Sequence, residues 1–178
     1  MIKNIIFDMG EVLIHWTPEM ILDRFHLEGE DREIIKWKIL KSYQWSLLDD
    51  GYYENLDDFL AEMLPKIPEH LRPVAVDVAK HWYKPTIAPV AGMAELLDEL
   101  KKHGYKLYLL SNAGPNHRDY WHEVPGHGYF DGICVSAYEK LYKPSIAIFE
   151  RILEKFSLVA DECVFIDDLN TNCAGAFL

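Results

Sequence analysis

Four short apolar runs, separated by longer amphipathic segments, constrain the fold of this 178-residue chain more than any other feature. The runs cover residues 2–7, 105–111, 132–136 and 163–167, and turn or polar residues bound each of them. Brief apolar runs are typical of strands that helices cover on both faces. Between the runs, apolar residues recur at helical spacing, as at positions 93, 96, 97 and 100. Strands that alternate with helices predict an α/β fold with a Rossmann-like parallel sheet and right-handed crossovers.

The stretch from residue 17 to residue 85 follows a different pattern. It contains no convincing strand run, and its Trp, Tyr and Leu residues recur at helical spacing. Gly51 and the prolines at 65, 68 and 73 divide it into three or four predicted helices. We therefore expect an all-helical domain at 17–85, inserted after the first strand of a core that consists of residues 1–16 and 86–178.

The composition narrows the classes of partner and compartment. A net charge of −11 argues against nucleic acid or an anionic membrane surface as the main partner, because both need a basic patch. No apolar window reaches membrane-span length, and the N-terminal apolar run is too short for a signal peptide. The three cysteines form neither a C-x-x-C pair nor a zinc-binding spacing, so plain thiols in a reducing cytoplasm are expected. A small phosphorylated substrate is compatible with the charge, because a local metal ion can override it.

Polar side chains follow the predicted strands at their carboxyl ends, where open parallel sheets bind ligands. Asp8 ends the first strand, Ser111-Asn112 the second and Asp167-Asp168 the fourth, and Lys143 opens the helical segment near the third. Three acids that converge here would repel one another unless a cation lay among them. Their hard oxygen ligands suit Mg²⁺, which also binds substrate phosphates and several waters. Ser111 and Lys143 would then hold phosphate oxygens, the first as a hydrogen-bond donor and the second as a point charge.

These residues lie in motifs through which the chain resembles a haloacid dehalogenase superfamily hydrolase with a small helical cap. Four motifs of that superfamily occur in order: FDMGEVL, LLSNAG, the lysine of YKPSIAIF, and VFIDDLNTN. Each motif is weak alone, but each follows or adjoins a predicted strand, and the helical insert lies directly after the first motif, where the family has its cap. The first motif is similar to that of bacterial sugar-1-phosphate phosphatases of the α-glucose-1-phosphate type.

The resemblance implies a nucleophile and a metal site. Asp8 would attack phosphorus and form an aspartyl-phosphate. Asp8 and Asp168 would bind Mg²⁺, with Asp167 as a ligand either directly or through water. The backbone carbonyl of Gly10 would be a further ligand.

The resemblance also implies a cradle for the phosphoryl group. Ser111 and Lys143 would fix that group, and backbone N–H groups around Met9 and Asn112 would complete the cradle. His117, in SNAGPNHRDYW, is a candidate for binding or orienting the substrate, with capping or a surface position as the alternative. Together these residues predict a Mg²⁺-dependent phosphomonoester hydrolase that acts on a small metabolite such as a sugar phosphate, with the cap closing over it.

The insert offers further candidates for contact with the substrate. Trp45, Trp82 and Tyr83 could face the active site, although packing in the core is the commoner fate of such aromatic residues. The Asp49-Asp50-Gly51 segment has the composition of an ordinary turn. Cap loops in the family often reach the substrate, so this turn is a candidate as well.

Position 10 departs from the family pattern. Most phosphatases of the superfamily carry a second Asp two residues after the nucleophile, and this chain has Gly10 there. That Asp protonates the leaving group and then activates water, a contribution typically of about 10²–10⁴-fold. Another group, such as Glu11, a cap residue or a metal-bound water, could take over the proton, or the substrate could have an easier leaving group. A slow enzyme or a protein without catalytic activity is the third alternative.

Two competing functions share the predicted fold. A 2-haloacid dehalogenase uses an Asp nucleophile without a metal, which the acids at 167 and 168 disfavour. A degenerate member of the superfamily would act as a binding or regulatory protein. The chain ends inside the predicted helix after the fourth motif, so we expect a truncated C-terminus or an uncovered sheet edge. Such an edge favours pairing, and we expect a monomer or a weak homodimer.

Overall fold

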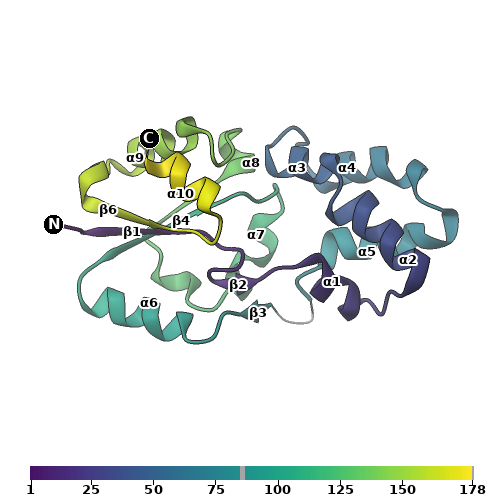
Figure 1. Ribbon diagram of the computed structural model, residues 1–178, viewed down its shortest axis with the longest axis horizontal. Helices are drawn as coiled ribbons and strands as arrows, with labels where there is room; N and C mark the ends of the chain where they lie inside the picture. Colours follow the sequence, from purple (N-terminus) through teal and green to yellow (C-terminus); the bar gives the residue numbers. More distant parts are fainter. Residues whose placement is uncertain (85–86, 178) are drawn as a thin grey trace.

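The computed structural model describes residues 1–84 and 87–177 (Figure 1). Its main sheet has the strand order β5-β4-β1-β6, and all three neighbouring pairs are parallel. The strands are β1 (Asn4–Phe7), β4 (Lys106–Ser111), β5 (Gly132–Val135) and β6 (Cys163–Ile166). The first and last residues of each strand lie within two residues of the ends of the corresponding predicted run. The parallel sheet confirms the predicted α/β class.

Helices cover both faces of this sheet (Figure 1). On one face, Ile5 and Phe7 share an apolar cluster with Leu97 of α6 (Met93–Lys102). On the other, Ile6 packs in a cluster with Ile148 of α9 (Ile146–Phe156), and α10 (Asn170–Phe177) lies on the same side. Successive residues of a strand point to opposite faces, so a continuous apolar run serves both layers. The shorter helices α7 (His117–Tyr120) and α8 (Ser136–Glu139) follow β4 and β5.

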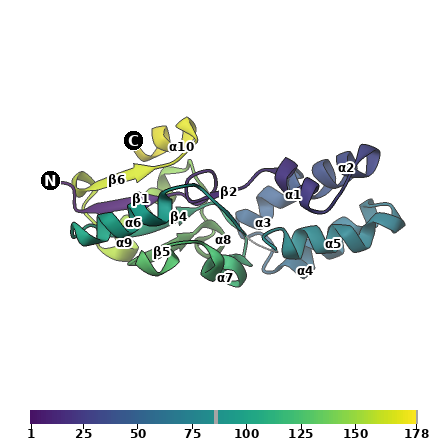
Figure 2. The same cartoon turned by 90° about the horizontal axis from the view of Figure 1, so that it is seen from below.

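Five α-helices lie between residues 18 and 81 of the described chain, in a body beyond one end of the sheet (Figure 2). They are α1 (Pro18–Arg24), α2 (Gly29–Ile35), α3 (Tyr43–Asp49), α4 (Leu56–Met63) and α5 (Arg72–His81). Side-chain caps start three of them, because Thr17, Ser42 and Asn55 accept hydrogen bonds from backbone N–H groups of the first turn. A π-helical turn (Lys36–Leu40) continues α2. These helices are the all-helical insert of the predicted fold class.

The described insert contains five α-helices, more than the three or four that Gly51 and the prolines predicted. The break between α1 and α2 falls at His26, whose φ of 55° lies in the left-handed region that residues other than glycine seldom adopt. Gly29, which opens α2 with a φ of 54°, is the signal for this break that the sequence prediction did not use.

Two short strands bring the ends of the insert together. β2 (Ile14–His15) pairs antiparallel with β3 (Ala88–Pro89), so the segments that enter and leave the insert lie side by side. The predicted boundary between residues 85 and 86 lies outside the described residues, and the division into two domains stays a prediction.

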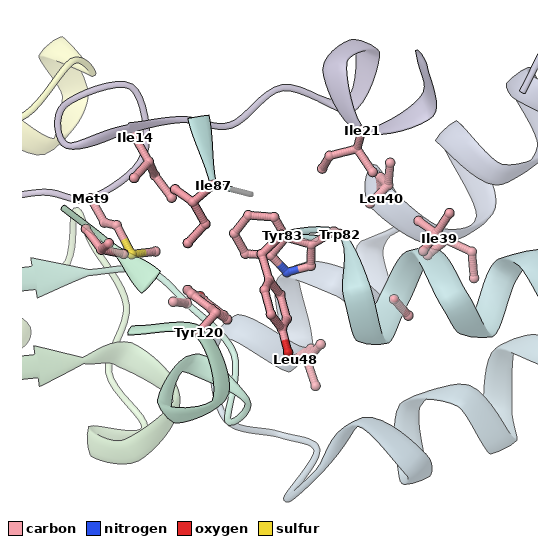
Figure 3. Close-up of a cluster of buried hydrophobic side chains, with 14 of the residues drawn as sticks. Met9, Ile14, Ile21, Ile39, Leu40, Leu48, Trp82, Tyr83, Ile87 and Tyr120 are labelled. Atoms are coloured by element: carbon pink, nitrogen blue, oxygen red, sulfur yellow. The ribbon is translucent and has the colours of Figure 1, made fainter. Parts of the chain in front are cut away.

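One apolar cluster joins the insert to the core (Figure 3). Met9, Ile14 and Tyr120 belong to the core side of this cluster, while Leu48 and Trp82 come from the insert. Aromatic contacts cross the junction, with the rings of Trp82 and Tyr120 centred 4.8 Å apart. The insert is therefore held over the carboxyl ends of the strands. Within the described residues, no helix combines the length and apolar character needed to cross a bilayer.

Candidate active site

The carboxyl ends of β1 and β6 bring three acids together. Phe7 is paired with Ile166, and Asp8 donates its backbone N–H to the Ile166 carbonyl at 2.9 Å. The acids that follow these strands therefore leave the sheet side by side. One carboxylate oxygen each from Asp8, Asp167 and Asp168 lies within 4.8 Å of the others. The predicted convergence of these three side chains is present in the structure.

Lys143 lies between two of these acids. Its Nζ is 2.8 Å from Asp8 Oδ1 and 2.7 Å from Asp167 Oδ2, and its side chain is 1% exposed. A buried ammonium is tolerated only when its charge is paired, and two carboxylates pair it here. Three carboxylates against one ammonium still leave an excess of negative charge, which favours a cation.

Asp167 is the most fully hydrogen-bonded of the three acids. Besides Lys143, it accepts hydrogen bonds from the Asn172 side chain at 3.0 Å and from the Leu169 backbone N–H at 2.9 Å. These donors occupy both of its carboxylate oxygens. The geometry therefore suits Asp167 to orient Lys143 more than to bind a metal directly. Sequence reasoning did not single out Asn172, and its position inside the fourth motif was the only available signal.

The second motif supplies a buried hydroxyl and a bracing amide. Ser111 ends β4, is 2% exposed and lines the cavity beside Asp8. The Asn112 side chain donates to the Lys143 carbonyl at 3.1 Å and accepts from the Lys143 backbone N–H at 2.9 Å. Because its amide is used in this way, Asn112 holds the lysine segment against β4. A contact with substrate would then come from the Asn112 backbone.

His117 does not join the other predicted site residues. Its ring stacks on Trp121 at a centroid distance of 5.3 Å and packs edge-on against Tyr120. It is 2% exposed, and burial together with the Arg118 charge lowers the pKa of His117 to about 4. It is not among the residues that line the cavity. The four-residue helix α7 is too short for a sequence pattern to show which way this side chain points.

The residues after the nucleophile are arranged around a short turn. A Cβ built on Gly10 would meet no heavy atom within 4 Å, so packing does not demand glycine there. The Glu11 carboxylate accepts a hydrogen bond from the Trp16 backbone N–H at 2.6 Å and lies 3.3 Å from His15 Nδ1. Both Gly10 and Glu11 line the cavity.

Two acids of the cluster have pKa values raised by their surroundings. Burial raises the pKa of Asp8, an effect that Lys143 opposes and the charge of Asp167 reinforces. Burial and the neighbouring Asp167 also raise the pKa of Asp168, which lies on the exposed side of the cluster. Hard carboxylate oxygens at this spacing, with one exposed acid that leaves room for waters, fit Mg²⁺.

A cavity of about 330 Å³ opens above the cluster. Strand-end residues form its floor, and the insert supplies Leu40, Trp45, Ser46, Asp49 and Trp82. Of the three aromatic candidates in the insert, Trp45 and Trp82 line the cavity. Tyr83 instead packs against Tyr120, with the two ring centroids 5.4 Å apart. The cavity thus has a polar floor and a largely apolar roof.

A family model described as a haloacid dehalogenase-like hydrolase matches residues 2–176. The chain belongs to this hydrolase family. The predicted resemblance is therefore confirmed. A sesquiterpene phosphatase of Aspergillus oryzae is 29% identical over 181 residues, which cover 98% of this chain and 84% of that protein.

Solved structures share the fold over nearly the whole chain. One is a family enzyme from Bacteroides thetaiotaomicron, solved as a mutant in complex with magnesium and inorganic phosphate. It is 24% identical to this chain with a TM-score of 0.74, and the match covers 90% of its length. The L-2-haloacid dehalogenase from Xanthobacter autotrophicus is 20% identical with a TM-score of 0.70 and is covered to 74%. Each likeness covers 99% of this chain. The fold is therefore common to enzymes with different chemistry, and the site must decide between them.

Proposed function

We propose that this hydrolase is a Mg²⁺-dependent phosphomonoesterase that acts through an aspartyl-phosphate on Asp8. One observation carries the proposal: carboxylate oxygens of Asp8, Asp167 and Asp168 lie within 4.8 Å of one another, and Lys143 pairs with two of these acids. A cation among them would relieve their repulsion, and the same cation would attract a phosphate. The phosphatase relative and the magnesium and phosphate bound by the solved enzyme agree with this chemistry.

Each predicted residue has a distinct task in this mechanism. Asp8 and Asp168, with the carbonyl of Gly10, would hold Mg²⁺, which when bound neutralises charge on the phosphate and the carboxylates. Lys143 aims the Asp8 carboxylate through its 2.8 Å contact and would also hold a phosphate oxygen. Ser111 would donate a hydrogen bond to that group.

The reaction has two displacement steps. A carboxylate oxygen of Asp8 forms a bond to phosphorus, and the bond from phosphorus to the alcohol oxygen breaks with its electron pair on that oxygen. Water then attacks phosphorus, and the bond to Asp8 breaks to regenerate the carboxylate and release inorganic phosphate. Asp167 would hold Lys143 in place, and Asn172 would hold Asp167 through its side-chain amide.

The cavity suits a small organic phosphate. Its volume of about 330 Å³ is that of a site for a small metabolite. A sugar phosphate is the substrate that the first motif favours. The lining includes the large apolar side chains of Trp16, Leu40, Trp45, Trp82 and Tyr120, which favour an organic group with an apolar face. The face of a sugar ring and an isoprenoid chain both meet this condition, and the relative from Aspergillus oryzae is a sesquiterpene phosphatase.

The dehalogenase alternative requires an Asp8 carboxylate that attacks carbon without help from a metal. Without a cation, Asp8 would have to be ionised beside the carboxylates of Asp167 and Asp168 before it could attack, and their repulsion disfavours that state. The acidic cluster therefore favours the phosphatase.

A panel of phosphomonoesters with and without Mg²⁺ tests the proposal. The panel contains sugar phosphates, isoprenoid phosphates, benzyl phosphate and p-nitrophenyl phosphate. We expect turnover that EDTA abolishes and that Asp8→Asn lowers by at least about 10³-fold. Asp161→Asn is the matched control, because Asp161 is an exposed residue in the turn that precedes β6. This variant should behave like the wild type. Equal turnover by wild type and Asp8→Asn, or turnover that EDTA leaves intact, would overturn the proposal.

A further inference from the structure

The proposed mechanism needs a proton donor that the first motif does not supply. The alcohol oxygen that leaves phosphorus must gain a proton, and Gly10 has no side chain to give one. Glu11 is close in sequence, but its two carboxylate oxygens are engaged by the Trp16 N–H and by His15. Glu11 is therefore poorly placed to turn toward a substrate. The donor has to come from another wall of the cavity.

Asp49 occupies that wall. It is the last residue of α3, and it lines the same cavity as Asp8 from the side of the insert. Its backbone carbonyl accepts a hydrogen bond from the Ser136 hydroxyl of the core. The end of α3 is thereby fastened to the edge of the sheet that carries the predicted site.

The turn after Asp49 also packs closely against the core. Gly51 has a φ of 77°, and a Cβ there would collide with the backbone carbonyl of Ala137. Only glycine allows this approach. Two contacts with consecutive core residues, Ser136 and Ala137, therefore hold Asp49 in position over the cavity.

The surroundings of the Asp49 carboxyl favour its protonated form. Among the described residues, none donates a hydrogen bond to this carboxyl or forms an ion pair with it. The titratable groups that face it are the phenols of Tyr120 and Tyr142, which also line the cavity. Burial raises the pKa of Tyr142 to about 12, and it raises the pKa of Tyr120 well above the usual value, so both stay neutral. Asp49 is half-buried, and this desolvation raises the pKa of its carboxyl well above the ordinary range.

Tyr142 lines the same cavity as Asp49 and the nucleophile Asp8. A substrate whose phosphate met Asp8 would carry its ester oxygen into the space between the floor and α3. A neutral carboxyl in such a space is a good hydrogen-bond and proton donor.

We propose that Asp49 is the general acid of this enzyme and replaces the acid missing at position 10. The inference rests on the proposed phosphatase function. As the bond from phosphorus to the alcohol oxygen breaks, the Asp49 carboxyl gives its proton to that oxygen and becomes a carboxylate. In the second step, water attacks the phosphorus on Asp8 and loses a proton to the Asp49 carboxylate, which restores the acid.

Two probe substrates of similar shape test this assignment. Benzyl phosphate releases an alcohol that needs a proton, whereas p-nitrophenyl phosphate releases a phenolate that does not. Because both substrates share the second step, kcat/KM, which reports release of the leaving group, is compared. Asp49→Asn should lower kcat/KM for benzyl phosphate by about 10²-fold or more and change kcat/KM for p-nitrophenyl phosphate by only a few fold. The wild type should lose benzyl phosphate turnover as pH rises and Asp49 ionises, and Asp49→Asn should lack this decline. Asp50→Asn changes an exposed neighbour in the same turn and should match the wild type on both substrates.

The outcomes separate this proposal from the function on which it rests. If wild type hydrolyses neither probe with Mg²⁺, the proposed function fails. If wild type is active and Asp49→Asn lowers kcat/KM equally for both probes, or leaves kcat/KM unchanged for both, the assignment of the acid is wrong. Asp49→Ser, which leaves a smaller uncharged side chain, is assayed in parallel, with thermal unfolding of both variants. An equal loss of kcat/KM on both probes in two folded variants would assign Asp49 a structural role.

Discussion

Replacement of Lys143 by Met tests how far the stability of the fold depends on the predicted site. The Lys143 ammonium lies 2.8 Å from Asp8 Oδ1 and 2.7 Å from Asp167 Oδ2 in a buried position. At such distances each pair has a Coulomb energy of about 6 kcal/mol for an effective dielectric constant near 20, before desolvation is subtracted. Removing one partner leaves buried carboxylates uncompensated. We therefore expect Lys143→Met to lower the free energy of unfolding by about 3–5 kcal/mol.

Thermal unfolding in EDTA measures this loss. For a chain of this size, 1 kcal/mol corresponds to roughly 2–4 °C, so Tm should fall by about 6–20 °C. Lys102→Met is the matched control, because it breaks an exposed pair with Asp98 and should leave Tm unchanged. Adding Asp167→Asn to Lys143→Met removes one orphan charge and should restore part of the stability without restoring activity. If Lys143→Met lowered Tm no more than Lys102→Met does, the reasoning about the buried ion pairs would be refuted.

Three further predictions concern the metal, position 10 and Asp49. Mg²⁺ at 100 times its Kd should raise the free energy of unfolding by about 2.7 kcal/mol, and Asp168→Asn should abolish this gain in a thermal-shift titration. Because a Cβ on Gly10 meets nothing within 4 Å, Gly10→Asp should fold normally and raise benzyl phosphate turnover of the Asp49→Asn enzyme by up to about 10²-fold. No gain would show that position 10 does not reach the leaving group. Desolvation raises the pKa of Asp49 in the folded protein. The protonated Asp49 therefore contributes its full stability below the ordinary carboxyl pKa, and this contribution is lost as pH rises through the raised pKa. Asp49→Asn should thus gain Tm over the wild type as pH rises from about 4 to 8, and a difference independent of pH would contradict the burial.

The sheet and its acidic edge could be predicted because each rests on a local pattern. A strand covered on both faces needs a continuous apolar run, and the polar residue after it marks the carboxyl end. Asp8 and Asp168 follow such runs, and the parallel pairing of β1 with β6 then brings them together. Ser111 follows the same rule at the end of β4.

Pairing between side chains could not be predicted from a pattern along the chain. The contact of Lys143 with Asp167 and the use of the Asn112 amide to hold the lysine segment depend on the tertiary arrangement of three loops. His117 was a further candidate for the site, yet its ring packs on Trp121 and is buried away from the cavity. Asp49 has the sequence of a plain turn, and only the docking of α3 on the core gives it a place in the cavity.

A rapid acid quench during turnover tests the central claim most directly. Wild-type enzyme is mixed with p-nitrophenyl phosphate and Mg²⁺, stopped in acid within one turnover, digested and examined by mass spectrometry. The account predicts a phosphorylated peptide that contains Asp8 and is absent from Asp8→Asn and from the reaction in EDTA. Turnover with the phosphoryl group on another residue, or an equal rate in Asp8→Asn without any phosphorylated peptide, would contradict it.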